Sequence, residues 1–224
     1  MCSLLGYAGG MSVMLQASLL DPAGFSNDAP ALTSPSALAP LTEARRTDLG
    51  AGAWVDYLPH WLPGSDSVFE CLADRVPWKA EKRRMYDRVV DVPRLVAWYV
   101  AGAQLPHQVL TSARENLSSH YGLDLVTAGL CFYRDGRDSV AWHGDRIGRG
   151  ATDDTVVAIV SVGAARPLLL RPREGGSSVR FELGHGDLIV MGGSCQRTFD
   201  HAVPKTDRVV GPRISVQFRA AGVA

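Results

Sequence analysis

The sequence predicts an α+β protein that is mainly β, built as a double-sheet jelly roll with helices supporting one side. Three observations predict this class. The 224 residues are 46% hydrophobic, which is enough for a packed core. Helical spacing of apolar residues occurs before Gly122, and several short apolar runs follow it. Gly, Pro and Asp divide these runs, so we expect one domain with a row of strands in its second half.

The first part of the chain shows neither helical nor alternating periodicity. Residues 21–47 are rich in Pro, Ala, Ser and Leu, a composition typical of a flexible arm. We therefore expect a flexible N-terminal arm over residues 1–47 and a folded domain over residues 48–222.

Two helices are expected before Gly122. The first covers residues 65–72, with Ser65 or Asp66 as its N-cap. The second covers residues 106–121, and Gly122 supplies its stop. Its apolar residues recur at helical spacing: Val109, Leu110, Ala113 and Leu117.

Seven short strands are expected after Gly122, each bounded by turn residues. They cover residues 128–133, 155–161, 167–171, 178–183, 187–191, 201–203 and 213–218. No internal repeat is evident.

The charge balance limits the ways in which the chain could contact nucleic acid. Lysine plus arginine equals aspartate plus glutamate at 23 each, so no global positive field draws the chain onto nucleic acid. Any contact must be local. Residues 79–88 are one candidate, because basic residues outnumber acids there and the aromatic Tyr86 is interleaved. The alternative is an exposed, solvated loop.

The cysteines and the apolar runs bear on location. Cys2, Cys71, Cys131 and Cys195 are widely spaced, so neither a zinc knuckle nor a disulfide framework is indicated. No run is long enough to span a bilayer. We expect a monomer in the reducing cytoplasm, with no membrane partner.

A metal site is predicted from His143-Gly144-Asp145 and the later His201. Two imidazoles and one carboxylate on one face of a metal leave the other face open, as non-haem Fe(II) oxygenases require for a keto acid and dioxygen. The same three letters recur at His185-Gly186-Asp187. That copy directly precedes an apolar run, so its aspartate is expected to cap or hydrogen-bond local backbone.

The last expected strand carries a polar face. Arg213, Ser215, Gln217 and Arg219 alternate with apolar residues, so a period of two places all four on one side. A planar guanidinium pairs bidentately with a carboxylate, and Arg213 is the candidate for the far carboxylate of 2-oxoglutarate.

Three segments resemble the AlkB family: residues 130–145 around the first His-Gly-Asp, residues 213–219, and Pro93-Arg94-Leu95-Val96-Ala97-Trp98-Tyr99. The likeness runs from about Trp54 to Arg219. It implies a double-stranded β-helix that uses Fe(II), 2-oxoglutarate and dioxygen. Because only the first His-Gly-Asp lies in the resembling block, the resemblance favours His143, Asp145 and His201 as the iron ligands.

The resemblance also implies roles around the iron. It assigns co-substrate binding to Tyr133, Arg213, Ser215 and Arg219. Trp98 and Tyr99 lie where relatives place an aromatic that stacks on a flipped base, and Arg94 and Tyr86 are further substrate-binding candidates. Trp98, Tyr99 and Tyr133 could instead be packed core aromatics.

Three departures from the family pattern are visible. Cys131 stands where many relatives have asparagine, Ser215 and Gln217 replace the usual Asn and Thr of the closing strand, and Ile147 stands where many carry an acid. An amide contact to 2-oxoglutarate is therefore lost or supplied elsewhere, and base choice is open.

The function implied by the resemblance is oxidative demethylation of N-alkylated bases, of the 1-methyladenine and 3-methylcytosine type, in DNA or RNA. Formaldehyde and succinate would be released. One alternative is a hydroxylase of a protein or small molecule that uses the same cofactors. The other is a metal-binding jelly-roll module without turnover, which the polar face around Arg213 makes less suitable.

Overall fold

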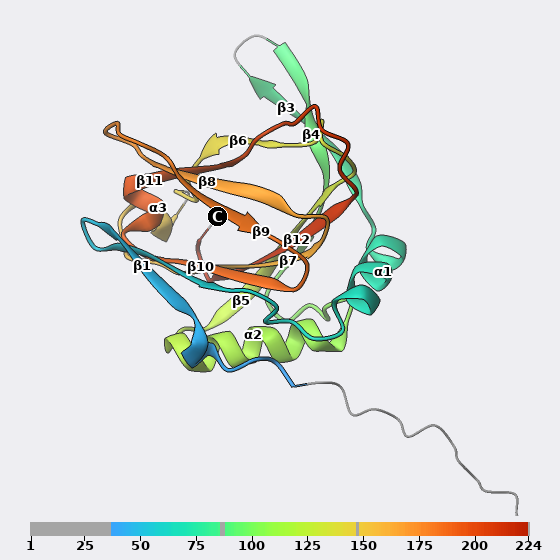
Figure 1. Cartoon of the computed structure of the whole chain (residues 1–224), viewed down its shortest axis with the longest axis horizontal. Helices are drawn as coiled ribbons and strands as arrows, with labels where there is room; N and C mark the ends of the chain where they lie inside the picture. The colour runs from blue at the N-terminus through green and yellow to red at the C-terminus, as the bar shows by residue number, and fades with distance from the viewer. Residues whose placement is uncertain (1–36, 86–87, 147, 224) are drawn as a thin grey trace, which may run out of the picture. The chain divides into compact units, whose positions relative to one another are not determined.

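Two antiparallel β-sheets that pack against each other form the frame of the domain (Figure 1). The structure is a computed structural model that describes residues 37–85, 88–146 and 148–223, without the side chains of residues 83–91. These residues lie within one compact unit, Pro35–Ala224. No described helix is long and apolar enough to cross a membrane.

The larger sheet has eight strands, and every neighbouring pair is antiparallel. In spatial order they are β1 (Arg45–Gly50), β2 (Ala53–Leu58), β10 (Asp187–Gly193), β7 (Val157–Gly163), β12 (Arg213–Ala220), β5 (Leu125–Tyr133), β4 (Arg88–Tyr99) and β3 (Lys79–Met85). The strand with the polar face, β12, therefore lies between β7 and β5 near the middle of the sheet.

The smaller sheet has four strands: β6 (Val140–His143), β11 (Phe199–Val203), β8 (Arg166–Pro172) and β9 (Val179–Leu183). The short elements η1 (Leu41–Glu43), η2 (Arg149–Ala151) and α3 (Cys195–Thr198) complete the frame. Because neighbours in the sheet come from distant parts of the sequence, the motif around residue 143 and the segment around residue 201 meet on adjacent strands.

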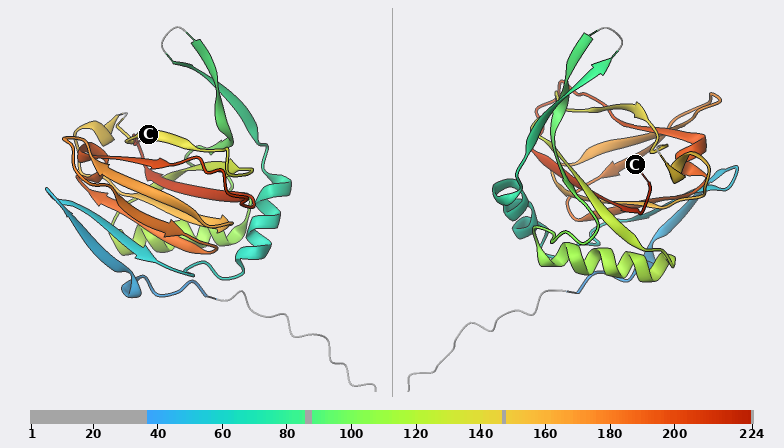
Figure 2. Two further views of the ribbon diagram at one scale, coloured as in Figure 1. Left: turned by 45° about the horizontal axis from the view of Figure 1, so that its top comes forward. Right: turned by 180° about the vertical axis from the view of Figure 1, so that it is seen from behind.

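Two helices cover the outer face of the larger sheet: α1 (Ser65–Arg75) and α2 (Gln108–Tyr121) (Figure 2). Leu72 of α1 and Leu117 of α2 are fully buried in one apolar cluster with the residues that β12 turns outward. Those β12 residues are Ile214, Val216 and Phe218. Each such side chain contributes about 1.5–3 kcal/mol when fully buried, so this layer holds the helices on the sheet.

The space between the two sheets holds a second cluster. Tyr133 and Ile159 of the larger sheet pack there with Leu168, Leu170 and Leu183 of the smaller one. The polar residues of β12 face this interior, because they alternate with the residues in the helix-side cluster. The predicted jelly roll with supporting helices is confirmed, and so is the division of β12 into a polar and an apolar face.

Both predicted helices and all seven predicted strands are present, with ends that differ by a few residues. Gly122 caps α2 in the left-handed conformation at φ 64°, as expected of a glycine stop. The predicted N-cap of α1 is wrong. Gly64 caps that helix, and Ser65 instead donates its hydroxyl to the Leu62 carbonyl.

The alternative interpretation of residues 79–88 as a solvated loop is wrong for the described residues 79–85 and 88. Residues 79–85 form β3, Arg88 begins β4, and the two paired strands project from the sheet (Figure 1). A strand at a sheet edge has unpaired backbone groups on one side, and often both of its faces meet solvent. Charged residues are common there, so the sequence shows no alternation that would predict a strand. Pro93 also reads as a strand breaker, but it lies at an irregularity in the β3–β4 pairing, where proline is tolerated.

The folded domain begins earlier than residue 48. Leu41 of η1 is buried in the helix-side cluster, and β1 pairs with β2 from Arg45 onward. The sequence of β1 shows no alternation of apolar and polar residues, because an edge strand that is solvated on both faces needs none. No sign of this strand was therefore visible in the sequence. Residues 1–36 lie outside the described part of the chain, so a flexible arm there stays a prediction.

Candidate active site

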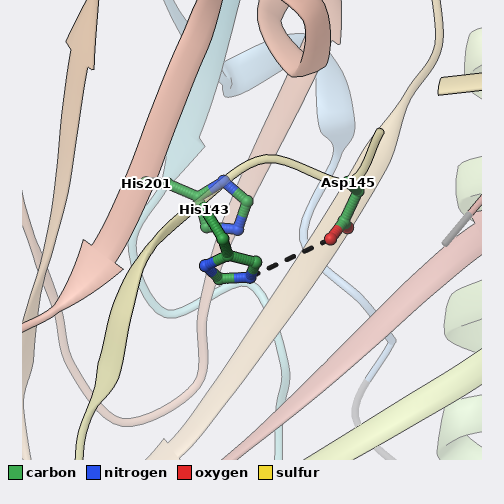
Figure 3. Close-up of side chains that lie close together, drawn as sticks. All are labelled: His143, Asp145 and His201. Atoms are coloured by element: carbon green, nitrogen blue, oxygen red, sulfur yellow. Dashed lines mark ion pairs between the residues drawn. The ribbon is translucent and has the colours of Figure 1, made fainter. Parts of the chain in front are cut away.

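The three predicted metal ligands converge. His143 ends β6, its antiparallel partner on β11 is His201, and Asp145 follows two residues after β6. The ligating atoms of the three side chains all lie within 4.8 Å of one another. The two rings stand 4.2 Å apart between centroids, with the Asp145 carboxylate facing His143 (Figure 3).

The two imidazoles are held ready to bind a metal. His143 Nδ1 lies 2.9 Å from the Ala141 carbonyl, which fixes the proton on Nδ1 and leaves the Nε2 lone pair toward Asp145. Burial lowers the pKa of His143 despite the neighbouring carboxylate. Burial, together with the adjacent His143, lowers the pKa of His201 to about 3. Both rings are therefore neutral near neutral pH.

The third ligand, Asp145, is fixed at both its backbone and its side chain. Its backbone N–H donates to Gln196 Oε1 at 3.0 Å, and Arg219 Nε donates to Oδ2 at 2.7 Å. Burial raises the pKa of the Asp145 carboxyl, but the charge and hydrogen bond of Arg219 outweigh it and hold this pKa below its ordinary value. Oδ1 stays available, 4.0 Å from His143 Nε2.

The donor set fits Fe(II). Two neutral imidazoles and one carboxylate on one side, with no further His, Cys, Asp or Glu in the cluster among the residues that the structure describes, leave the opposite side open. That is the facial arrangement of non-haem Fe(II) oxygenases.

Gln196 was missed by the sequence reasoning. It lies on the short α3, and Gly144 permits its approach, since a Cβ at Gly144 would stand 2.8 Å from the Gln196 carbonyl oxygen. The only sequence signal was the glycine between the two ligands, which indicates a close approach without saying of what.

Arg213 is a buried cation without a carboxylate partner in the described parts of the chain. Its side chain is 1% exposed, its Nε donates to Ser161 Oγ at 2.9 Å, and its Nη1 has no partner. Its Cζ stands 5.2 Å from the ring centroid of Tyr133, its antiparallel neighbour on β5. Burial lowers the pKa of Arg213. A buried, unpaired guanidinium is costly, so the pocket suits an anionic ligand.

The remaining co-substrate candidates lie on the same interior face. Tyr133 is buried, and burial raises the pKa of its hydroxyl to about 12, so it is a donor at neutral pH. Ser215 accepts a hydrogen bond from Gln217 Nε2 at 2.5 Å. Arg219 already holds Asp145, and its Nη1 is buried without a partner.

Trp98 and Tyr99 lie on opposite faces of β4. Trp98 pairs with Gly129 on the interior face, is 57% exposed and lies beside Arg219, whose Cζ is 5.9 Å from its ring. Tyr99 pairs with Ala128 and packs against the helix-side cluster. Tyr99 therefore faces the helices and not the metal ligands, because alternation along a strand sends neighbours to opposite faces.

Arg94 was expected to bind substrate, but its side chain points inward. Its Nε donates to Cys131 Sγ at 3.3 Å and its Nη1 to the Ser139 carbonyl at 3.2 Å. Arg94 thus lies beside Cys131, the residue that stands where many relatives have asparagine. Tyr86 and Ile147 lie outside the described residues, so the expectations for both stay untested.

Three comparisons with known proteins bear on the family and the fold of the chain. The model of the 2OG-Fe(II) oxygenase superfamily matches residues 97–219. A "DNA oxidative demethylase ALKBH2" of Arabidopsis thaliana is 30% identical over 221 residues, covering 79% of the chain and 69% of that relative. The bovine (Bos taurus) "Alpha-ketoglutarate-dependent dioxygenase alkB homolog 3" is 32% identical over 184 residues, covering 70% of the chain. The chain spans 62% of that bovine relative's length.

A solved structure, "The structure of OsALKBH1", superposes with a TM-score of 0.58 over 79% of the chain and 100% of its own length. At 14% sequence identity this likeness concerns the fold alone. It agrees with the jelly roll described above.

Proposed function

The chain belongs to the AlkB family within the 2OG-Fe(II) oxygenase superfamily, and from this premise we propose that it removes N-alkyl groups oxidatively from bases in nucleic acid. The proposed adducts are of the 1-methyladenine and 3-methylcytosine type, in DNA or RNA. Fe(II), 2-oxoglutarate and dioxygen are the cofactors of this family. The observation that carries the proposal is the buried, unpaired Arg213, on the same face of β12 as the arginine that holds Asp145.

His143, Asp145 and His201 would hold Fe(II). The fixed Nδ1 proton of His143 and the Arg219 contact to Oδ2 orient two of the three donors before any metal arrives. Preorganised ligands lose little conformational freedom on binding, which favours affinity and a defined open side.

Arg213 would pair with the distal carboxylate of 2-oxoglutarate, and the Tyr133 hydroxyl would donate to the same molecule. Ser215 lies between Arg213 and Arg219 on β12, and Arg219 contacts Asp145. A dicarboxylate here would neutralise the Arg213 charge and supply the acceptor that Nη1 lacks.

Bound together, the three cofactors supply an oxidant that hydroxylates an N-methyl group, with release of succinate and carbon dioxide; the N-hydroxymethyl base then loses formaldehyde. The chain's residues position the co-substrate, keep both imidazoles neutral and exclude bulk water with the apolar wall between the sheets.

Trp98 alone would stack on the target base. Its exposed ring lies on the interior face beside the arginine that contacts Asp145, so a base on it would lie near the metal. An alkylated base unpairs at low cost, and stacking holds it without demanding one sequence. We also propose that the protein is a monomer and that it lies in the cytoplasm. The described cysteines support the second proposal, because they are free thiols, as a reducing compartment keeps them.

The test is methyl removal from a short oligonucleotide that bears 1-methyladenine or 3-methylcytosine, followed by mass spectrometry. Fe(II)-reconstituted wild type, His143→Ala and His185→Ala are compared with 2-oxoglutarate in air. We expect methyl loss in wild type and in His185→Ala, and at least about a thousandfold slower loss in His143→Ala, because one metal donor is gone. Running single-stranded, double-stranded and RNA versions in parallel would settle the preferred nucleic acid.

Other outcomes would redirect the assignment. Succinate without methyl loss would favour a hydroxylase of a protein or small molecule. Neither product, despite bound iron, would favour a metal-binding module without turnover. Equal activity in His143→Ala and wild type would remove His143 from the metal site.

A second test addresses the co-substrate clamp through Arg213→Met. We expect the KM for 2-oxoglutarate to rise by about a hundredfold or more, because a buried charged partner is lost. The ligand-free protein should unfold at the same or a higher temperature, since the substitution removes an unpaired buried charge. A large loss of stability with an unchanged KM would show that Arg213 is structural.

A further inference from the structure

A second fully buried arginine lies beside the co-substrate pocket. Arg166 opens β8 and is 1% exposed. Its Nη1 donates to the Asp135 carbonyl at 3.0 Å, and its Nη2 donates to the carbonyls of Asp138 and Pro204 at 2.9 and 2.7 Å. Its Nε is buried without a partner. No carboxylate pairs with it in the described ranges of the chain.

The three carbonyls belong to connections between functional strands. Asp135 and Asp138 lie in the turn that joins β5, which ends at Tyr133, to β6, which ends at His143. Pro204 directly follows β11, which carries His201. One guanidinium therefore ties together the ends of the strands that bear the co-substrate tyrosine and two metal ligands.

Arg166 also adds charge to the pocket. Its Cζ lies 5.7 Å from the Tyr133 ring centroid, and the Arg213 Cζ lies 5.2 Å from the same centroid. The nearest acids do not neutralise it, because the Asp138 carboxylate pairs with Arg134 and the Asp135 carboxylate with Arg137. Two buried cations around one tyrosine exceed the charge that a single carboxylate at Arg213 would balance.

We propose that Arg166 is a positioning residue for the co-substrate pocket. Its buried charge strengthens binding of a dicarboxylate, and its hydrogen bonds to three carbonyls fix Tyr133 and the metal-bearing strands relative to one another. The inference rests on the proposed placement of 2-oxoglutarate against Arg213. It extends that placement to a residue that contacts neither the co-substrate nor the metal.

The test uses calorimetry to measure the Kd of 2-oxoglutarate for the anaerobic Fe(II)-loaded protein, without nucleic acid. Wild type, Arg166→Gln and Arg137→Gln are compared. Arg137 lies on the same turn but its side chain is 88% exposed, so its loss removes an equal charge at the surface. We expect the Kd to rise about tenfold in Arg166→Gln, as an effective dielectric of about 20 implies, and to change less than about twofold in Arg137→Gln.

A second variant separates charge from structure and serves if Arg166→Gln does not fold. Arg166→Lys keeps a charge that can be removed, because burial lowers the pKa of a lysine whereas an arginine stays charged. Tyr133, Arg213, Asp135 and Asp138 also face this position. Neither Asp135 nor Asp138 changes charge between about pH 6.5 and 9. Burial raises the Tyr133 pKa to about 12, above this window. The Kd of Arg166→Lys should therefore rise with pH across this window more steeply than that of wild type.

The outcomes distinguish the two proposals. Wild-type affinity in a folded, iron-loaded Arg166→Gln, or a pH profile of Arg166→Lys no steeper than that of wild type, would overturn the role of Arg166 and leave the proposed function standing. An equal weakening in Arg137→Gln would also overturn it, because surface charge would then suffice. Absence of 2-oxoglutarate binding in wild type would overturn the proposed function itself.

Discussion

His143-Gly144-Asp145 and His185-Gly186-Asp187 have the same three letters, yet their side chains face different partners. In the first copy, His143 turns Nε2 toward the cluster and Asp145 keeps Oδ1 available. In the second copy, His185 Nδ1 accepts a hydrogen bond from the Gly163 N–H at 2.8 Å, and its Nε2 lies 3.1 Å from the Asp66 carboxylate.

The two aspartates differ most. Asp187 accepts hydrogen bonds from the Tyr57 hydroxyl at 2.7 Å, the His60 N–H at 2.9 Å and the Gly184 N–H at 2.7 Å. Both of its oxygens are thus engaged in holding the turn before β10. Capacity to bind a metal is decided by which donor atoms remain unengaged, and the tripeptide alone does not determine that.

Replacing each aspartate with alanine tests most directly whether only the first copy binds the metal. Asp145→Ala should lose iron and slow succinate formation by about a thousandfold or more, because a metal donor and the anchor of Arg219 disappear together. Iron content by plasma mass spectrometry and succinate by chromatography measure the two effects. Iron retention at the wild-type level in this variant would contradict the ligand assignment.

Asp187→Ala is the matched change in the second copy. It should keep the iron content of wild type but lower the free energy of unfolding by about 2–4 kcal/mol, since three hydrogen bonds to a buried carboxylate are lost. Urea denaturation of both metal-free variants gives the difference. Loss of iron in Asp187→Ala without loss of stability would mean that the copies share the metal site.

The glycines offer a smaller contrast. Gly186 has φ +82°, and a Cβ there would stand 2.5 Å from Ser65 Oγ, so Gly186→Ala should cost about 1–3 kcal/mol of stability. Gly144 has no positive φ, but a Cβ there would press on the Gln196 carbonyl at 2.8 Å. Gly144→Ala should therefore act mainly on the metal, weakening iron affinity by about tenfold through the support of Asp145.

Iron titration and thermal unfolding of both glycine variants test this contrast. The expected pattern is a large stability loss with normal iron affinity for Gly186→Ala, and weaker iron affinity with a smaller stability loss for Gly144→Ala. The reverse pattern would mean that Gln196 does not support the metal site.

Much of the site could be predicted from the sequence because its residues carry distinctive chemistry at fixed intervals. Alternation along β12 gave the polar face, and the resemblance favoured the first His-Gly-Asp. The position of Trp98 and Tyr99 in a motif does not say which of the two neighbours faces the interior. Only the pairing of Trp98 with Gly129 decides that.

Gln196 and Arg166 were not predicted for a different reason. Gln196 acts through one hydrogen bond from a four-residue helix, and Arg166 acts through carbonyls, which every residue has. Neither leaves a pattern of residue types. Such contacts depend on how distant segments meet in space, which spacing along the chain does not encode.

The smallest expected effect is the pH dependence of stability that arises from His201, the strand partner of His143. Its pKa is about 3 in the folded, metal-free protein and about 6.5 in the unfolded chain, so the unfolded state binds more protons between these values. Stability must then fall as pH decreases below 6.5, by about 1 kcal/mol between pH 7 and 5.5 from this residue. Urea denaturation of metal-free wild type and His201→Gln at both pH values should show a shallower dependence in the variant, because glutamine does not titrate. An equally steep dependence in the variant would place the responsible group elsewhere.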